Sequence, residues 1–494
     1  MRALDVGIIV LFLVGMPLLG VWIGGRQRSS ADYFVSERRI SWWVVCVSVV
    51  SAETSTLTVL SVPTVAYGGT MTFLSLAFGY LVGRVVVAFV LLPRYVAGDL
   101  ITAYGYLGKR FGAGVQGTAS VTFLITRLLA DGLRLFATAI PVKVVLAAYG
   151  VTASYWAIVA VLGVAMVVYS FLGGVRAVVW VDAIQMLWYV LGAVVVIAVL
   201  AGKLPDGWFA TAVDAGKFRV LDLDANPLTS PYALPTALIG GAVLSMASHG
   251  ADQLIVQRLM ATREVRAARK ALIASGVVVI LQFALFLVIG VLLWAFYRGA
   301  NPVTDLGLAN NDELFANFIV RELPSGLSGF VIAGILAAAL SSSLGALASS
   351  TVTDVVQRVV RRELTEAEVF RQGRLWTAVW AVLLIVFAGL FATFTRRGNP
   401  IVEQGLSISG FTYGALLGAF LLGLLFRRAR QADAVVAFVA TVVVMAFVIL
   451  AVDVDGKALA YPWYPPLGVL VTLVVGGLLS LRRPAGVRLP AGRL

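Results

Sequence analysis

Hydrophobic positions along this chain are grouped into long blocks, which shorter polar segments separate. A helix of about 20 apolar residues crosses a hydrocarbon core of about 30 Å, so each block predicts one transmembrane helix. We predict about thirteen such helices, over residues 4–24, 41–67, 71–96, 118–148, 154–174, 178–202, 233–257, 271–297, 326–356, 375–395, 402–426, 432–452 and 464–481. The pattern therefore predicts an all-α polytopic membrane protein.

Composition supports this class, since 60% of the 494 residues are hydrophobic, 13% are charged, and the mean hydropathy is +0.95. The net charge of +13 suggests no nucleic-acid partner, because Lys and Arg concentrate in alternate loops such as the run Arg258 to Lys270. By the positive-inside rule these loops are cytoplasmic. We expect a cell (inner or plasma) membrane protein with its N-terminus outside and its C-terminus in the cytoplasm.

The polar connections are too short for an independent soluble core. The longest lie at 203–232 and 298–325, and the second is expected to hold a short helix over Asp312 to Arg321 that covers an entrance. The chain has one cysteine, Cys46, and one histidine, His249, which are too few for a metal cluster or a disulfide. We therefore expect no enzyme and no cofactor.

The order of the predicted helices indicates an internal repeat. Helices two to six start from the inside and helices seven to eleven start from the outside, and inverted repeats are common in secondary transporters. We expect a single transporter domain over residues 1–494. Its expected parts are a peripheral first helix and loop at 1–40, a first inverted repeat at 41–202, an external loop at 203–232, a second inverted repeat at 233–427, and peripheral C-terminal helices at 428–494.

The second predicted helix is a candidate for an interruption. Glu53 lies in its middle among hydroxyl residues, and Pro63 removes a backbone donor further on. The alternative is a Pro-kinked packing helix whose hydroxyls bond their own carbonyls. An intramembrane carboxylate is costly and marks a functional site by default, which favours local unwinding at a binding site.

The ninth predicted helix has many small hydroxyl residues in an apolar sequence: Ser341, Ser342, Ser343, Ser349, Ser350, Thr351 and Thr353. In hydrocarbon, polar groups must find partners within the protein, so these face a bundle interior, a cavity or an ion. Close packing of small residues between helices is the alternative.

Other intramembrane charges have two interpretations each. Arg127, Asp131 and Arg134 share one helical face, so they form either a neutralised ion-pair ladder or a site where one arginine binds a substrate carboxylate. Asp182 near a helix N-terminus is either a dipole partner or an ion-site residue. His249 precedes Asp252, and a lone histidine is either a structural group or part of a site.

Several segments together resemble the sodium:solute symporter family, whose members carry sugars, proline, pantothenate or sialic acid. The segments are SAETS at 51–55, GGVRAVVWVDAIQ at 173–185, DQLIVQR at 252–258, AGILAAALSSSLGALASSTVTD at 333–354 and GALLGAFLLGLLFRR at 414–428. The resemblance covers nearly the whole chain. It implies the leucine-transporter-like fold, a five-plus-five inverted repeat with interrupted helices, and sodium-driven uptake by alternating access.

The resemblance also implies a sodium site of neutral oxygens, which suits a hard cation. Its residues here are Val47, Val50, Ala338, Ser341 and Ser342. Some members hold a second sodium through an acid like Asp182 and further hydroxyls, here Ser343. The hydroxyl-rich segment of this chain is about three residues shorter than in many members, which is almost one helical turn. The chain therefore departs from the pattern of the members that hold a second sodium.

Family analogy places the solute between the interrupted second helix and helices three, four, seven and eleven. The candidate substrate residues are Glu53, Thr54, Ser55, Arg134, His249, Asp252 and Gln404. A small organic solute is expected, and a sugar, an amino acid and an organic anion stay open. The expected partners are this solute, sodium as the coupling ion and the lipid bilayer, with the protein functional as a monomer. The alternatives are a proton-coupled carrier that uses Glu53 or Asp182, and a solute sensor that does not transport.

Overall fold

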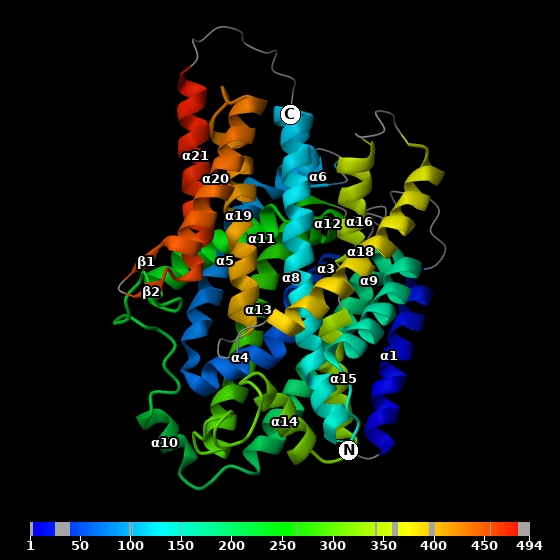
Figure 1. Ribbon diagram of the computed structural model, residues 1–494, viewed down its shortest axis with the longest axis vertical. Helices are drawn as coiled ribbons and strands as arrows, with labels where there is room; N and C mark the ends of the chain where they lie inside the picture. Colours follow the sequence, from blue (N-terminus) through cyan, green and yellow to red (C-terminus); the bar gives the residue numbers. More distant parts are fainter. Residues whose placement is uncertain are drawn as a thin grey trace.

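The computed structural model describes residues 3–24, 40–97, 100, 102–148, 150–262, 264–340, 343–357, 364–394, 401–454 and 456–482. Helices make up almost all of this structure, and α1 lies at the opposite edge of the bundle from α20 and α21 (Figure 1). In the described ranges, the only strands are the antiparallel pair β1 (Asp453–Val454) and β2 (Lys457–Ala458). The expectation of an all-α protein is confirmed.

The α-helices are α1 (Ala3–Gly24), α3 (Trp42–Glu53), α4 (Thr56–Gly68), α5 (Leu74–Val90), α6 (Leu92–Ala97), α7 (Tyr104–Phe111), α8 (Ala113–Ala148), α9 (Tyr155–Ala201), α10 (Trp208–Asp214), α11 (Gly241–Gly250), α12 (Gln253–Met260), α13 (Val265–Phe296), α14 (Glu313–Glu322), α15 (Leu327–Leu340), α16 (Leu344–Ser350), α18 (Glu366–Phe394), α19 (Ile401–Leu425), α20 (Gln431–Ala451) and α21 (Tyr464–Leu481). Short 3-10 helices are η2 (Met71–Phe73) and η5 (Tyr461–Trp463), and π-helical turns are η3 (Thr236–Gly240) and η4 (Thr351–Val356).

Among the described residues, eight helices are long and apolar enough to cross a membrane, or nine if the bent pair α3 and α4 is one span. The four other predicted spans correspond to α8, the first part of α9, α11 with α12, and α15 with α16. These helices are either short or, like α8, carry several charged residues. The chain is a multi-pass membrane protein.

Helix α9 differs from the expectation of two separate helices at 154–174 and 178–202. Its helical hydrogen bonding runs through 47 residues, from Tyr155 to Ala201. At 1.5 Å per residue this is about 70 Å of helix, more than twice the hydrocarbon thickness, so α9 cannot be one straight span. It contains both predicted spans.

The predicted interruption of the second span is confirmed. Helix α3 ends at Glu53, α4 begins at Thr56, and the two are bent by 65°. The break falls at Thr54 and Ser55, whereas Pro63 lies inside α4. Thr54 ends α3, since its N–H donates to the Val50 carbonyl at 2.8 Å, and the Ser55 and Thr58 side chains form a capping box that starts α4.

A second interruption separates α11 from α12, at Ala251 and Asp252. Asp252 is the N-cap of α12, where its Oδ1 accepts from the Leu254 N–H at 2.9 Å. Close contact holds α11 against α5, because a Cβ atom at Gly83 would lie 2.2 Å from the Ala242 carbonyl oxygen. Only glycine permits this approach.

Helix α1 is joined to the N-terminus of α15 through a buried carboxylate. Asp5 Oδ1 accepts from the N–H groups of Gly326 and Gly329, at 2.7 and 2.8 Å, and from Ser328 Oγ at 2.8 Å. These N–H groups lie in the first turn of α15, where the helix itself offers no acceptors. Asp5 therefore caps a helix that lies far from it in sequence.

The short helix predicted in the loop at 298–325 is confirmed as α14, which spans Glu313–Glu322. Its N-cap residue, Asp312, is buried and accepts from the Ile401 N–H at the start of α19, at 3.1 Å. The neighbouring Asn311 carbonyl accepts from Thr64 Oγ1 of α4 at 3.4 Å. The loop is thus attached to both α4 and α19.

Candidate functional site

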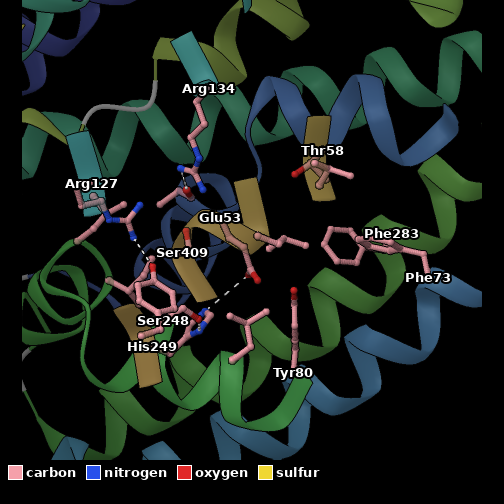
Figure 2. A pocket seen from close by; sticks show the side chains of 17 residues that line it. Glu53, Thr58, Phe73, Tyr80, Arg127, Arg134, Ser248, His249, Phe283 and Ser409 are labelled. Atoms are coloured by element: carbon pink, nitrogen blue, oxygen red, sulfur yellow. Dashed lines mark hydrogen bonds and ion pairs between the residues drawn. The ribbon is translucent and has the colours of Figure 1, made fainter. Parts of the chain in front are cut away.

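A cavity lies beside the α3–α4 break, with room for the centres of water-sized molecules of about 90 Å³. A water needs about 10–15 Å³ by this measure, so the space fits a small solute or several waters. Figure 2 shows its side chains converging from several helices. The lining residues are Ala52, Glu53, Thr58, Phe73, Tyr80, Arg127, Arg134, Leu244, Ser248, His249, Leu254, Ile255, Phe283, Val402, Leu406, Ser409 and Tyr413.

Glu53 lies at the end of α3 and forms an ion pair with Arg84 of α5. Arg84 is fully buried, and its Nη1 donates to Ser275 Oγ of α13 at 2.7 Å. Buried charges are stable only when paired and hydrogen-bonded, so each of these groups requires the other. Glu53 keeps 18% of its side chain exposed.

His249 lies next to Glu53, with its Nε2 3.7 Å from Glu53 Oε2 (Figure 2). On its other side, Nδ1 is 3.1 Å from the Ser245 carbonyl and 2.8 Å from Ser248 Oγ. A carbonyl only accepts, which assigns the proton of a neutral imidazole to Nδ1. In this tautomer Nε2 is an acceptor, so the imidazole donates nothing to Glu53.

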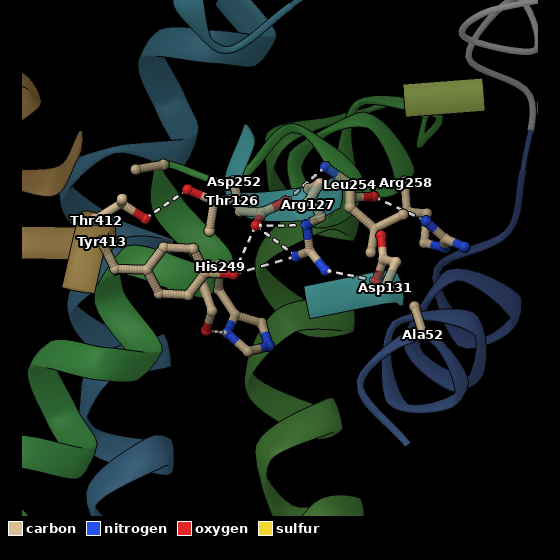
Figure 3. Close-up of polar contacts among 12 residues, drawn as sticks. Ala52, Thr126, Arg127, Asp131, His249, Asp252, Leu254, Arg258, Thr412 and Tyr413 are labelled. Carbon is tan, nitrogen blue, oxygen red and sulfur yellow. Dashed lines mark hydrogen bonds and ion pairs between the residues drawn. The ribbon is translucent and has the colours of Figure 1, made fainter. Parts of the chain in front are cut away.

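Arg127 and Asp252 form the most enclosed ion pair of the site (Figure 3). Arg127 Nε donates to Asp252 Oδ2 at 3.0 Å, and Tyr413 Oη donates to the same oxygen at 2.6 Å. Arg127 also lies 3.6 Å from Asp131, one turn along α8. These contacts saturate Asp252 and make it a structural partner of Arg127.

Arg134 is held more loosely than Arg127. Its Nη1 donates to the Ala52 carbonyl at 3.3 Å and lies 3.7 Å from Asp131 Oδ1. Its side chain is 29% exposed, against 5% for Arg127. Arg134 therefore presents donors to the cavity, and a guanidinium suits a carboxylate through two parallel hydrogen bonds.

The opposite wall of the cavity is apolar. The rings of Phe73 and Phe283 meet edge to face, with centroids 5.3 Å apart. Leu244, Val402 and Leu406 add further apolar side chains to the lining. The cavity thus combines a charged side with a side that favours carbon, as small-molecule sites commonly do.

On α13, Gln282 supports the α3–α4 break. Its Nε2 donates to Thr54 Oγ1 at 2.6 Å, and Thr54 Oγ1 donates to the Val50 carbonyl at 2.8 Å. The first turn of α4 is tied to α15, since Thr56 Oγ1 donates to the Ile335 carbonyl at 3.2 Å. Neutral hydrogen bonds therefore fix the ends of both half-helices.

Asp182 of α9 contacts the middle of α3 and is not among the residues that line the cavity. Its Oδ2 accepts from Arg258 Nη2 at 2.8 Å and from Ser48 Oγ at 3.1 Å. We expected Arg258 in a cytoplasmic loop, and this is wrong, because it lies in α12 and only 3% of it is exposed. The buried carboxylate of Asp182 explains this position, since a buried charge needs a partner.

The structure brings three of the predicted substrate residues, Glu53, Arg134 and His249, to the cavity wall. Thr54 and Ser55 form the break behind it, and Asp252 and Gln404 are outside the described lining. Val47 and Val50 lie on α3, and Ser343 is the N-cap of α16. The side chain of Ala338, and all of Ser341 and Ser342, lie outside what the structure describes.

Sequence reasoning did not select Arg84, Tyr80, Phe73, Phe283, Ser248, Ser409 or Tyr413, all of which belong to this site or support it. Arg84 had a detectable signal, because it is a charged residue in the middle of an apolar span. The aromatic residues had none, since apolar rings in a membrane helix do not reveal whether they face lipid or a cavity.

Solved structures match this fold closely. A Na⁺-coupled sialic acid symporter in a substrate-bound outward-open state aligns with a TM-score of 0.85 and 24% identity, over 98% of each chain. Mhp1, a nucleobase-cation-symport-1 family transporter in a closed conformation, aligns with a TM-score of 0.60 and 13% identity, over 92% of this chain and 95% of Mhp1. The expected leucine-transporter-like fold is confirmed.

Sequence relatives agree with the structural matches. The sodium/sialic acid symporter NanT of Aliivibrio fischeri is 27% identical over 94% of this chain and 91% of its own length. The human sodium/iodide cotransporter is 27% identical over 85% of this chain and 66% of its own length. The model of the sodium:solute symporter family matches residues 33–451. This chain belongs to the sodium:solute symporter family, as a membrane symporter that couples sodium to a small organic solute and not as an enzyme.

Proposed function

We propose that this symporter imports a small organic solute bearing a carboxylate, which binds at the cavity beside the α3–α4 break. The observation that carries this proposal is the difference between the arginines of the site. Arg84 and Arg127 are each closely paired with a carboxylate, whereas Arg134 has one carbonyl and one distant carboxylate as partners. A solute carboxylate at Arg134 would replace weak contacts with a charge-assisted pair.

The proposed orientation in the membrane follows from the distribution of Lys and Arg among the loops, with the N-terminus outside and the C-terminus in the cytoplasm. Residues 41–202 and 233–427 are proposed as the inverted repeats, because each has a broken helix near its start. Alternating access would then move one set of helices against the other around the cavity. The monomer is proposed as the functional unit, because the cavity lies within one chain.

Sodium is proposed to bind at Val47, Val50, Ala338, Ser341 and Ser342. This proposal is supported by the end of α3 at the break and by the hydrogen bond that ties α4 to α15. Carbonyl and hydroxyl oxygens are the ligands that a hard cation prefers.

One sodium per solute is proposed. A second sodium at Asp182 and Ser343 would have to compete with the Arg258 guanidinium, which already lies 2.8 Å from Asp182. Two cations at one carboxylate repel each other, so Arg258 disfavours a second ion there.

Uptake into proteoliposomes tests the function. A sodium gradient should drive accumulation of a carboxylate, and Ser342→Ala should abolish it. Arg134→Gln should remove solute binding but leave the sodium-induced rise in melting temperature, because the two sites are separate. Uptake driven by a pH gradient without sodium would contradict sodium coupling, and uptake of uncharged sugars alone would contradict the role of Arg134.

A further inference from the structure

The two carboxylate oxygens of Glu53 have different surroundings. Oε2 accepts from Arg84 Nη2, and His249 Nε2 lies 3.7 Å from the same oxygen. Oε1 accepts no hydrogen bond from the residues that the structure describes, although Glu53 lines the cavity. Enclosed carboxylate oxygens normally have donors, because an unsatisfied acceptor costs free energy. A solute in the cavity can supply this donor.

Arg134 places an anion-binding group beside this acceptor. Its Nη1 donates to the carbonyl of Ala52, the residue before Glu53. Arg134 and Glu53 nevertheless form no ion pair with each other in the described structure, where their partners are Asp131 and Arg84. A cationic fork and an acceptor oxygen thus lie next to each other on the cavity wall without satisfying each other. Figure 2 shows both side chains directed into the same space.

The charges around the cavity limit what can bind there. Three arginines, Arg84, Arg127 and Arg134, face three carboxylates, Glu53, Asp131 and Asp252, which gives 3 − 3 = 0 with His249 neutral. With the co-transported sodium ion counted, a monoanion leaves the site neutral and a zwitterion leaves it with one positive charge. Net charge is costly in a low-dielectric interior, so both classes suit the site better than a cation, which would leave two positive charges.

We propose that Glu53 Oε1 binds a hydroxyl or ammonium group close to the solute carboxylate, so that the solute is an α-hydroxy or α-amino acid. This inference rests on the proposed function, in which Arg134 binds the carboxylate. Arg84 holds Glu53 ionised and leaves Oε1 facing the solute. Phe73 and Phe283 form the wall against which the carbon part of such an acid packs.

Matched solutes test the proposal on the unaltered protein. Each pair shares its carbon skeleton and differs only in the donor: lactate or alanine against propionate, and phenyllactate or phenylalanine against phenylpropionate. Binding is measured by thermal shift of the detergent-solubilised protein, with and without sodium. A site that hydrogen-bonds a substrate OH or NH rejects the analogue without it, so at least one donor-bearing acid should bind about 10-fold or more tighter than its partner.

A conservative variant tests whether Glu53 causes the preference for donor-bearing acids. Glu53→Asp keeps a carboxylate near Arg84 but withdraws it by one methylene, so the preference should fall to about 3-fold or less while propionate binding changes little. Glu322→Gln is the matched control, because Glu322 has an exposed ion pair with Lys203 in the external region. This control should keep the full preference.

Two failures can be told apart. If carboxylates bind in sodium but both members of each pair bind equally, the role of Glu53 is wrong and the proposed function stands. If neither member of any pair binds although sodium shifts the melting temperature, carboxylate recognition by Arg134 is wrong, and the inference is overturned with it.

Discussion

The two broken helices of this symporter differ in the hydrogen bonds that hold the backbone at their breaks. At the α3–α4 break, neutral groups fix the backbone: Gln282 donates to Thr54, and Thr54 donates to the Val50 carbonyl. At the α11–α12 break, Asp252 is clamped by Arg127 and Tyr413. The carbonyls before Asp252 are also occupied, since Gly250 accepts from Tyr95 Oη and Ala251 accepts from Tyr104 Oη, the latter at 3.0 Å.

This difference indicates that one break is suited to binding ligands and the other to stabilising the fold. Charged clamps with several partners resist rearrangement, because breaking them leaves a charge buried without compensation. Neutral single hydrogen bonds are worth about 1 kcal/mol each and can be exchanged for bonds to an ion or a solute. The first break is therefore suited to ligands, and the second holds α8, α12 and α19 together.

The largest expected effect comes from breaking the charged clamp. Asp252→Asn leaves the buried Arg127 with Asp131 as its remaining carboxylate partner, so the protein should lose about 3–5 kcal/mol of stability. Thermal unfolding in detergent measures this. Glu322→Gln, which breaks an exposed ion pair, should cost about 0–1 kcal/mol. Equal losses in both variants would show that the buried clamp at Asp252 stabilises the protein no more than an exposed ion pair does.

A loss of affinity without a loss of stability is expected at Arg134. Arg134→Gln should weaken carboxylate binding about 10- to 100-fold, because one charge-assisted bidentate pair is lost, and leave the melting temperature nearly unchanged. Arg127→Gln should have the reverse effect, because its main consequence should be a lower melting temperature and not a weaker affinity for carboxylates. Solute titrations and melting curves of both variants make this comparison, and matching phenotypes would show that the two arginines share one role.

Acidification is expected to stabilise the loop that contains α14 and contacts the first broken helix. Burial raises the pKa of Asp312 from 3.8 to about 6. Between these values the folded protein holds a proton that the unfolded chain releases, so the free energy of unfolding should fall as pH rises from about 4 to about 6 and then level off. Melting curves across this range should show the slope. Asp312→Asn should remove part of it, and an unchanged slope would assign it to other groups.

The smallest effect is expected from the neutral bonds at the first break. Gln282→Leu should cost about 1 kcal/mol and raise the sodium concentration for half-maximal uptake several-fold, because Thr54 loses its support beside Val50. Thr441→Val is the control. It removes a bond of similar strength, at 2.7 Å to Thr472 between α20 and α21, and should leave sodium dependence unchanged.

Charged residues in apolar helices predict where this site lies. They do not predict which of these charges form ion pairs with each other. Glu53, Arg134 and His249 were recognised because charged or polar groups in apolar helices require a reason. Arg127 and Arg134 flank Asp131 on one helical face and look equivalent in sequence. Their different roles depend on Asp252, which is 125 residues from Arg127 in sequence and reaches it only in the folded chain, as the N-cap of α12.

Similarly, Arg258 adjoins a basic loop in sequence, and only the fold shows that it is buried against Asp182. The break at Thr54 was predicted as a property of its helix, but its position was not. Pro63 is the strongest local signal, yet it is accommodated within α4. Bonds from Gln282 and the capping box of Ser55 determine where α3 ends, and the first of these is a contact between distant residues.

The carboxylate of Asp5 has a consequence for how the molecule is made. Its partners at the start of α15 follow 320 to 324 residues later in the chain. At about 5–20 residues per second, a ribosome needs roughly 16–64 s to reach them. During this time α1 carries a charge that lacks these partners near a membrane, where such a group is costly. The final packing of the first helix therefore has to wait until residues 325–329 have been made.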